Sequence, residues 1–158
     1  MLLLVGLVFG LSGCSLFNRG PDIQNWQPGV SPESQNIVFA SKADGNFQLF
    51  LLNPETGEKT QLTNNDFDDW GADWGPDGKR IVYVSQRDDN TDIYMLDTES
   101  GDEVRLTTDP GQDVNPKWSG KDTVIFNSDR TDLWEIFELS VSDNSLNQLT
   151  SSSSEGSE

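Results

Sequence analysis

WGPDGKRIVYVS, residues 74–85, is the stretch that decides the fold of this 158-residue chain. In its turn, GPDG at 75–78, the proline presets φ, the aspartate bonds back to the backbone, and the final glycine accepts a positive φ. The β-branched and aromatic run at 80–85 is typical of a strand. We therefore expect a short strand at 72–74, a tight turn and a second strand at 80–85.

Two more strands complete the same unit. After a turn at 86–91, the segment 92–97 predicts a third strand; after a turn at 98–101, the more polar segment 102–107 predicts a fourth. In the second strand the apolar side chains at 81 and 83 point to one face and those at 82 and 84 to the other, because side chains alternate along a strand. Such a strand must be covered on both faces, whereas the charged fourth strand suits a sheet edge.

The unit recurs with a period of about 44 residues. Leu-Thr pairs begin at positions 62, 106 and 149, which are 44 and 43 residues apart, and aromatic residues at 39, 83 and 126 follow the same spacing. Three units result, 25–68, 69–112 and 113–150. Four short antiparallel strands in about 40 to 45 residues are the signature of a β-propeller blade. The expected fold is all-β, a partial β-propeller of three four-stranded antiparallel blades, open unless another chain completes it.

These motif residues resemble a known repeat, the TolB-type propeller repeat, also called the WD40-like Pro-Asp repeat. The second unit carries it in Trp74 to Ser85, Arg87, Ile93, Tyr94, Asp97, Gly101, Leu106 and Thr107. The first unit departs with Val30 in place of the tryptophan, and the third with SGKD at 119–122 in place of the Pro-Asp-Gly turn. The resemblance covers roughly residues 25–150. It implies either a non-catalytic module that binds proteins in the cell envelope or the non-catalytic half of an oligopeptidase.

Three blades do not close a propeller, since closed rings have about four to eight blades. The two outer blade faces of an open array are apolar, and a large apolar face marks an interaction surface. Two chains could pair into a six-bladed ring, another envelope protein could supply the missing blades, or the chain could be a fragment of a longer gene. The tail at 151–158 is rich in Ser and Glu and is expected to be disordered.

The first 14 residues, MLLLVGLVFGLSGC, predict a lipoprotein signal. The apolar run at 2–11 is about half the length of a membrane-spanning helix and fits the h-region of a secretory signal. The sequence LSGC at 11–14 resembles the lipobox of bacterial lipoproteins. This implies a signal peptide at 1–13, lipidation of Cys14 within a linker at 14–24, and a periplasm-facing location at the outer membrane, because Ser15 replaces the aspartate of inner-membrane retention. The signal lacks the usual Lys or Arg; the alternative is a buried apolar strand with a core cysteine.

The charge balance narrows the class of partner. The chain has 10 Lys+Arg against 27 Asp+Glu, a net charge of −17, which repels nucleic-acid phosphates and anionic lipid. It contains no His and no GxSxG motif, so imidazole-dependent triads and histidine metal sites are excluded for this chain. We expect no enzymatic activity, no cofactor and no nucleic-acid partner.

The segment DDNTDIYMLDTE at 88–99 raises the possibility of a metal site. Its acidic and amide residues are spaced like the ligands of a calcium loop. Such a loop needs glycine at its sixth position, where this chain has Ile93, and the repeat counterparts Leu49 and Ile136 are also apolar. The prediction is a polar hairpin entering a strand, with no metal site.

Candidate binding residues share one repeat position. Asn25, Asp69 and Asp113 come just before the expected first strand of each unit, which puts them at one rim of the central channel. They are expected either to hold a cation or a partner's basic side chain, or to accept hydrogen bonds between blades. Trp26 and Trp70 stand beside two of them. Because only some units carry these aromatics, they are candidates for protein or sugar contact, with blade packing as the alternative.

Two arginines share another repeat position. Arg87 and Arg130 are expected to pair with acidic loop residues such as Asp88 or Asp132.

The leading functional hypothesis is a non-catalytic, lipid-anchored envelope propeller that binds envelope proteins as a scaffold. The alternatives are a propeller remnant or regulatory domain of a prolyl-oligopeptidase-like enzyme, and a glycan-binding propeller.

Overall fold

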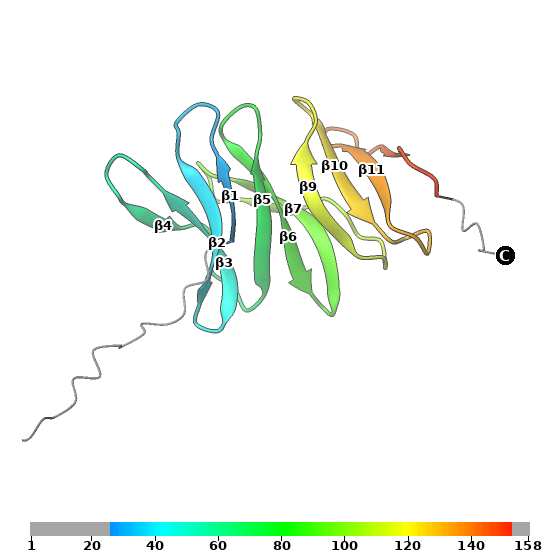
Figure 1. The fold of residues 1–158 in the computed structure, drawn as a ribbon, viewed down its shortest axis with the longest axis horizontal. Helices are drawn as coiled ribbons and strands as arrows, with labels where there is room; N and C mark the ends of the chain where they lie inside the picture. The colour runs from blue at the N-terminus through cyan, green and yellow to red at the C-terminus, as the bar shows by residue number, and fades with distance from the viewer. Residues whose placement is uncertain (1–25, 153–158) are drawn as a thin grey trace, which may run out of the picture.

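Three antiparallel sheets, each of four strands, stand side by side in a fan in the computed structural model, which describes residues 26–152 (Figure 1). Blade 1 contains β1 (Trp26–Val30), β2 (Ile37–Ala43), β3 (Asn46–Leu52) and β4 (Lys59–Gln61). Blade 2 contains β5 (Asp68–Trp74), β6 (Arg80–Arg87), β7 (Asn90–Asp97) and β8 (Glu103–Arg105). Blade 3 contains β9 (Asp113–Trp118), β10 (Thr123–Ser128), β11 (Glu135–Ser140) and β12 (Leu146–Gln148). The strands pair in sequence order within each blade, which confirms the predicted all-β, open partial propeller.

The turns between strands follow the sequence chemistry. Gly78 closes the β5–β6 turn with φ +64°, as expected for the Pro-Asp-Gly motif. Asp88 and Asp89 both have positive φ and form a two-residue hairpin turn, so β6 and β7 reach further than predicted. The β5 strand also begins earlier than predicted, at Asp68. The described residues include no helix long and apolar enough to cross a membrane.

Every inner strand carries a bulge at the same repeat position. Gln27, Gly71 and Asn115 have φ of 48°, 68° and 55°, in the left-handed region. The pairing of β1, β5 and β9 with the next strand shifts register at these residues. The bulge interrupts the alternation of side chains, which is why the start of β5 was not predicted as strand.

The repeated Leu-Thr pairs have a structural role. The hydroxyl of Thr63 accepts a hydrogen bond from Leu49 N at 2.9 Å, and Thr107 does the same for Ile93 N at 2.9 Å. Thr150 repeats the contact with Ile136 N at 2.9 Å. Each threonine therefore satisfies the backbone of the third strand at the point where the fourth strand has ended.

The core lies between the sheets. One cluster joins Val38, Ala40 and Leu49 of blade 1 to blade 2, and a second joins Val82 and Val84 of blade 2 to blade 3. The residues at 81 and 83 belong to the first cluster and those at 82 and 84 to the second, as the alternation predicted. The outer strands β4, β8 and β12 are each three residues long and exposed.

Candidate functional site: the Trp26 rim

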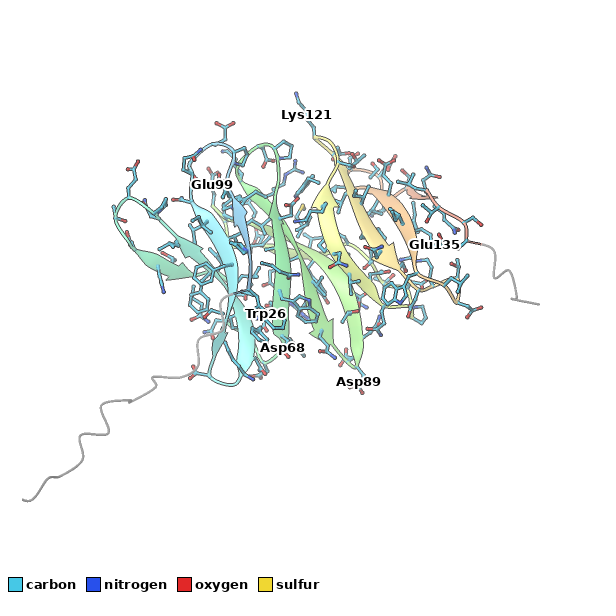
Figure 2. The ribbon with its side chains drawn as sticks, in the orientation of Figure 1. Trp26, Asp68, Asp89, Glu99, Lys121 and Glu135 are labelled. Carbon is cyan, nitrogen blue, oxygen red and sulfur yellow. The ribbon has the colours of Figure 1, made fainter. Side chains whose placement is uncertain are left out.

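Trp26 begins β1 at the edge of the fan that also carries Asp68 and Asp89, opposite the edge that carries Glu99 and Lys121 (Figure 2). Its indole is 49% exposed and stacks on the ring of Phe47, with 5.1 Å between ring centroids. We call this edge of the sheets the Trp26 rim. A half-exposed tryptophan held in place by a second aromatic ring offers a rigid apolar surface to the solvent.

Two charged groups frame the aromatic pair. Lys42 Nζ lies 5.7 Å from the centroid of the Phe47 ring, and Asp68 Oδ1 accepts a hydrogen bond of 2.6 Å from Phe47 N. The second contact ties blade 2 to the start of β3 in blade 1. Trp26, Lys42, Phe47 and Asp68 together form what we call the Trp26 patch. Phe47 and Asp68 join it only through the fold, because they lie about 20 and 40 residues after Trp26 in the sequence.

A polar hollow of about 440 Å³ opens at the β2–β3 hairpin, and two residues of its lining, Asn46 and Phe67, are chain neighbours of Phe47 and Asp68. It is lined by Asp44, Asn46, Gln48, Gln61, Asn64, Asn65, Asp66 and Phe67. Gln48 holds one wall in place: its Nε2 donates to the carbonyls of Asn65 (3.1 Å) and Phe67 (2.8 Å), and its Oε1 accepts from Asn65 N (3.2 Å). Carboxylate and amide oxygens line this hollow without a cationic side chain, which suits a lysine or arginine of a partner.

Asp69 lies inside β5 and is 0% exposed, so it is not a loop residue before the strand as predicted. Its Oδ1 accepts a hydrogen bond of 2.5 Å from Ser85 Oγ, and its Oδ2 accepts one of 2.9 Å from Asn65 Nδ2. Burial raises the pKa of the Asp69 carboxyl above its ordinary value, although these hydrogen bonds act in the opposite direction. The carboxyl thus fastens β5 to β6 and to the connection from blade 1.

Asp113 occupies the equivalent place at the start of β9 and is also 0% exposed. Both of its oxygens accept hydrogen bonds from Arg130 Nη2, at 2.9 and 3.0 Å, and Arg130 Nε donates to Ser128 Oγ at 2.8 Å. These bonds lie within blade 3, so the expected hydrogen bonding between blades is wrong for Asp113, whereas Asp69 does accept a bond from the segment that connects it to blade 1.

The arginine partners also differ from the prediction. Arg130 pairs with Asp113 rather than Asp132, and Arg87 pairs with Glu103 at 3.0 Å rather than Asp88. Asp88 and Asp132 have positive φ and shape their hairpins. A long arginine side chain reaches another strand of the same blade, which sequence proximity does not reveal.

Trp70, the repeat counterpart of Trp26, is partly buried and packs against both core clusters. The aromatic at this position is therefore at the surface in blade 1 and inside the fan in blade 2.

Asn25 and Cys14 lie outside the described residues, as do the signal at 1–13 and the tail beyond Ser152. Ser152 itself donates its N–H to Glu135 Oε1 at 2.5 Å.

The residues that resemble a calcium loop are engaged elsewhere. Asp92 pairs with Arg105 at 2.7 Å, and Glu99 pairs with Lys79 at 2.9 Å on another turn. Residues 26–152 contain no group of three or more Cys, His, Asp or Glu that could hold a metal ion. In the described part of the chain the rim offers aromatic, carboxylate and amide groups and no metal-binding cluster.

Comparisons with known proteins agree with this architecture. The family profile described as the TolB beta propeller domain matches residues 21–158. No curated protein sequence matches the chain. The structure of TolB from Acinetobacter baumannii is similar, with a TM-score of 0.74 and 23% identity over 81% of this chain and 32% of that chain.

Two further structures extend the comparison. A putative TolB from Agrobacterium tumefaciens has a TM-score of 0.71 and 33% identity, over 79% of this chain and 46% of that chain. A puromycin-hydrolyzing peptidase from Mycobacterium tuberculosis has a TM-score of 0.67 and 15% identity, over 82% of this chain and 21% of that chain, so it shares the fold alone. The chain spans less than half the length of each of these proteins. Its repeat, its three open blades and the match over residues 21–158 show that the chain belongs to the TolB beta-propeller family.

Proposed function

We propose that this chain is a non-catalytic, lipid-anchored propeller of the bacterial cell envelope that binds another protein through the Trp26 rim. The observation that carries the proposal is the half-exposed Trp26, stacked on Phe47 beside a polar, acid-lined hollow. Family membership supports a propeller module, and the net charge of −17 favours a cationic partner surface.

The predicted site residues have separate roles in this proposal. Trp26 contacts the partner directly, and Asn25, its chain neighbour, remains a candidate from the sequence alone. Asp69 and Asp113 are buried supports that hold the inner strands in register beneath it, and Trp70 fixes the neighbouring blade. The partner presents lysine or arginine together with an apolar side chain, since the patch and the acidic hollow are built from neighbouring residues of β3 and of the connection to β5.

Membrane attachment is the second part of the proposal. Cys14 would carry the lipid, and the linker at 14–24 would let the blades face the periplasm from the outer membrane. Labelling cells that express the full chain with an alkyne fatty acid tests this part. Label on the wild type and none on Cys14→Ser supports the anchor, and equal labelling of both contradicts it.

Photo-crosslinking tests the rim. A benzophenone amino acid at position 26 is expected to give a discrete crosslinked product in intact cells. The same amino acid at position 104 is the matched control, because Val104 is 50% exposed but lies on the outer strand β8. Equal products from both positions, or none from position 26, would contradict binding at the rim.

Variants in the rim then identify the contact. Lys42 lies over the Phe47 ring, and Asp66 lines the hollow. Lys42→Ala and Asp66→Ala are therefore each expected to change the yield of the crosslinked product formed from position 26. No specific observation in the described residues favours the two alternative functions, an oligopeptidase propeller and a glycan-binding propeller. The resemblance to the peptidase concerns the fold alone.

A further inference from the structure

Each blade of this chain has two unlike faces, built by alternate side chains of its two middle strands. In blade 2 the leading face consists of Ile81, Tyr83, Tyr94 and Leu96. In blade 2 the trailing face consists of Val82, Val84, Ile93 and Met95. The trailing face of blade 1 packs on the leading face of blade 2, and the trailing face of blade 2 on the leading face of blade 3. The chain thus contains one type of interface, used twice, and it always joins unlike faces.

Blade 1 begins the array with an intact leading face, formed by Ile37, Phe39, Phe50 and Leu52. The rings of Phe39 and Phe50 lie 5.9 Å apart, the same as Tyr83 and Tyr94 (5.9 Å) in blade 2. Within residues 26–152 the apolar neighbours of blade 1 come from blade 2, on the trailing side. On the leading side a hollow of about 260 Å³ is lined by Pro28, Ile37, Phe39, Leu52 and Lys59. Phe39 is 6% exposed and Ile37, Phe50 and Leu52 are partly buried, so the open part of this face is the hollow; its side chains are arranged as in the two leading faces that are covered elsewhere in the chain.

Blade 3 ends the array with an exposed trailing face. Ile136 is 38% exposed, whereas its counterparts Leu49 and Ile93 are 0% exposed inside the two interior interfaces. Trp134 and Leu149, on the same blade, are exposed as well. Exposed large apolar side chains gathered on one face mark an interaction surface.

Each of the two end faces carries a charged side chain beside its apolar residues, and the two charges are of opposite sign. On the trailing face of blade 3, Glu138 takes the place that Leu51 and Met95 hold in blades 1 and 2. On the leading side of blade 1, Lys59 extends over the Phe39 ring, with Nζ 5.8 Å from its centroid. One end of the array therefore carries an acid and the other a base, each beside an apolar surface.

We propose that a second copy of this chain covers both end faces, with the trailing face of blade 3 in each copy packed on the leading face of blade 1 in the other. The occupant is a second copy because the end faces keep Ile125 and Ile136 on one side and the Phe39–Phe50 pair on the other, as in the interface used twice. Asn127 and Glu138 are the polar replacements on the trailing face, and Lys59 is the base on the leading face. Two copies of the three described blades make six, within the range of about four to eight seen in closed propellers, whereas three copies would make nine. The two-fold axis lies along the propeller axis.

Sedimentation equilibrium of the full chain in a density-matched nonionic detergent tests this assembly. The wild type is expected at twice the protomer mass. Ile136→Asp on the trailing face and Leu52→Glu on the leading face each place a charge in the contact. Each is expected to weaken association about 100-fold or more. Val104→Asp, at an exposed valine on the outer strand β8, is expected to leave the mass unchanged. Near-ultraviolet circular dichroism checks folding, and Pro28→Asp on the same face replaces Leu52→Glu if that variant unfolds.

Mixing the two variants makes the test specific. In a head-to-tail pair, the intact trailing face of Leu52→Glu meets the intact leading face of Ile136→Asp, so the mixture regains species of twice the protomer mass. A pair that joined two like faces would regain none. A wild type that stays at the protomer mass at about 100 μM, or a mixture that shows no recovery, overturns the proposal.

Discussion

Arg130 holds the fully buried carboxylate of Asp113 through two hydrogen bonds from Nη2, at 2.9 and 3.0 Å. The same guanidinium lies 4.7 Å from the centroid of the Phe137 ring, in the interface between blades 2 and 3. The pair therefore ties the inner strand of blade 3 to the hairpin that follows β10. A carboxylate at this depth depends on its partner, because the protein interior solvates charge poorly.

Removing the arginine is expected to be costly. Arg130→Ala leaves the Asp113 carboxylate buried without its cation and should lower the free energy of unfolding by about 3 to 5 kcal/mol. Urea denaturation measures the change. The control is Lys117→Ala, because Lys117 pairs with Asp73 at 2.9 Å at an exposed site and should contribute about 0 to 1 kcal/mol. Equal losses in the two variants would contradict the role of burial.

The Leu-Thr motif predicts a graded effect along the chain. Thr107→Val removes the acceptor of the buried Ile93 N–H and should cost about 1 to 3 kcal/mol of unfolding free energy, whereas Thr107→Ser keeps the hydroxyl and should cost less. Thr150→Val removes the same bond at an exposed site and should cost less than Thr107→Val. Urea denaturation of the three variants checks the order, and a larger loss at Thr150 would argue against it.

Asp69 predicts a pH dependence of definite sign. Its folded pKa is raised by burial above the ordinary 3.8, so its contribution to stability is present below the unfolded pKa and is lost as pH rises through the folded pKa. Asp69→Asn should therefore gain stability relative to the wild type as pH rises from about 4.

Asp143 is the control of opposite sign. Hydrogen bonds from the backbone N–H of Ser145 lower its folded pKa, so its contribution is present above the unfolded pKa and is lost as pH falls through the folded pKa. Asp143→Asn should thus lose stability relative to the wild type as pH rises. Unfolding free energies are measured from pH 3 to 8 for the wild type and both variants. The difference between variant and wild type should rise with pH for Asp69→Asn and fall with pH for Asp143→Asn. If the two differences changed with pH in the same direction, burial would not govern Asp69.

Two glycines separate backbone strain from steric contact. Gly57 has φ +73° with open space around its Cα, whereas a Cβ at Gly78, φ +64°, would lie 2.6 Å from Glu33 Cγ in the neighbouring blade. Gly57→Ala should cost about 1 kcal/mol, and Gly78→Ala about 1 to 3 kcal/mol more. Adding Glu33→Gly should recover most of that excess in thermal or urea unfolding. Equal costs at the two glycines would show that Glu33 moves away freely.

Much of the fold follows from the repeat in the sequence. The spacing of 44 and 43 residues is carried by core side chains and by the Leu-Thr pairs, so it predicts blades and the faces of their middle strands. The bulges were not predicted because Gln27, Gly71 and Asn115 share a backbone conformation but no side-chain chemistry. A left-handed φ is a property of backbone pairing that the repeat alignment does not display.

The candidate site was predicted only in part. The sequence singled out Trp26 and Asp69, but the fold exposes the first and buries the second. The Trp26 patch depends on Phe47 and Asp68, which come close only when β3 and β5 pack together. Its one sequence signal is that Phe47 is aromatic where the second unit has Thr91, a difference between units like the one that singled out Trp26.

The three-residue outer strands bear on how this chain behaves at high concentration. An exposed strand edge recruits further strands when it is long and flat, and this is the route to amyloid. Edges as short as β4, β8 and β12 offer too few backbone groups to template an incoming chain. In the proposed assembly, association would therefore proceed through blade faces rather than strand edges, and the curvature of the fan would favour a finite particle over a fibre.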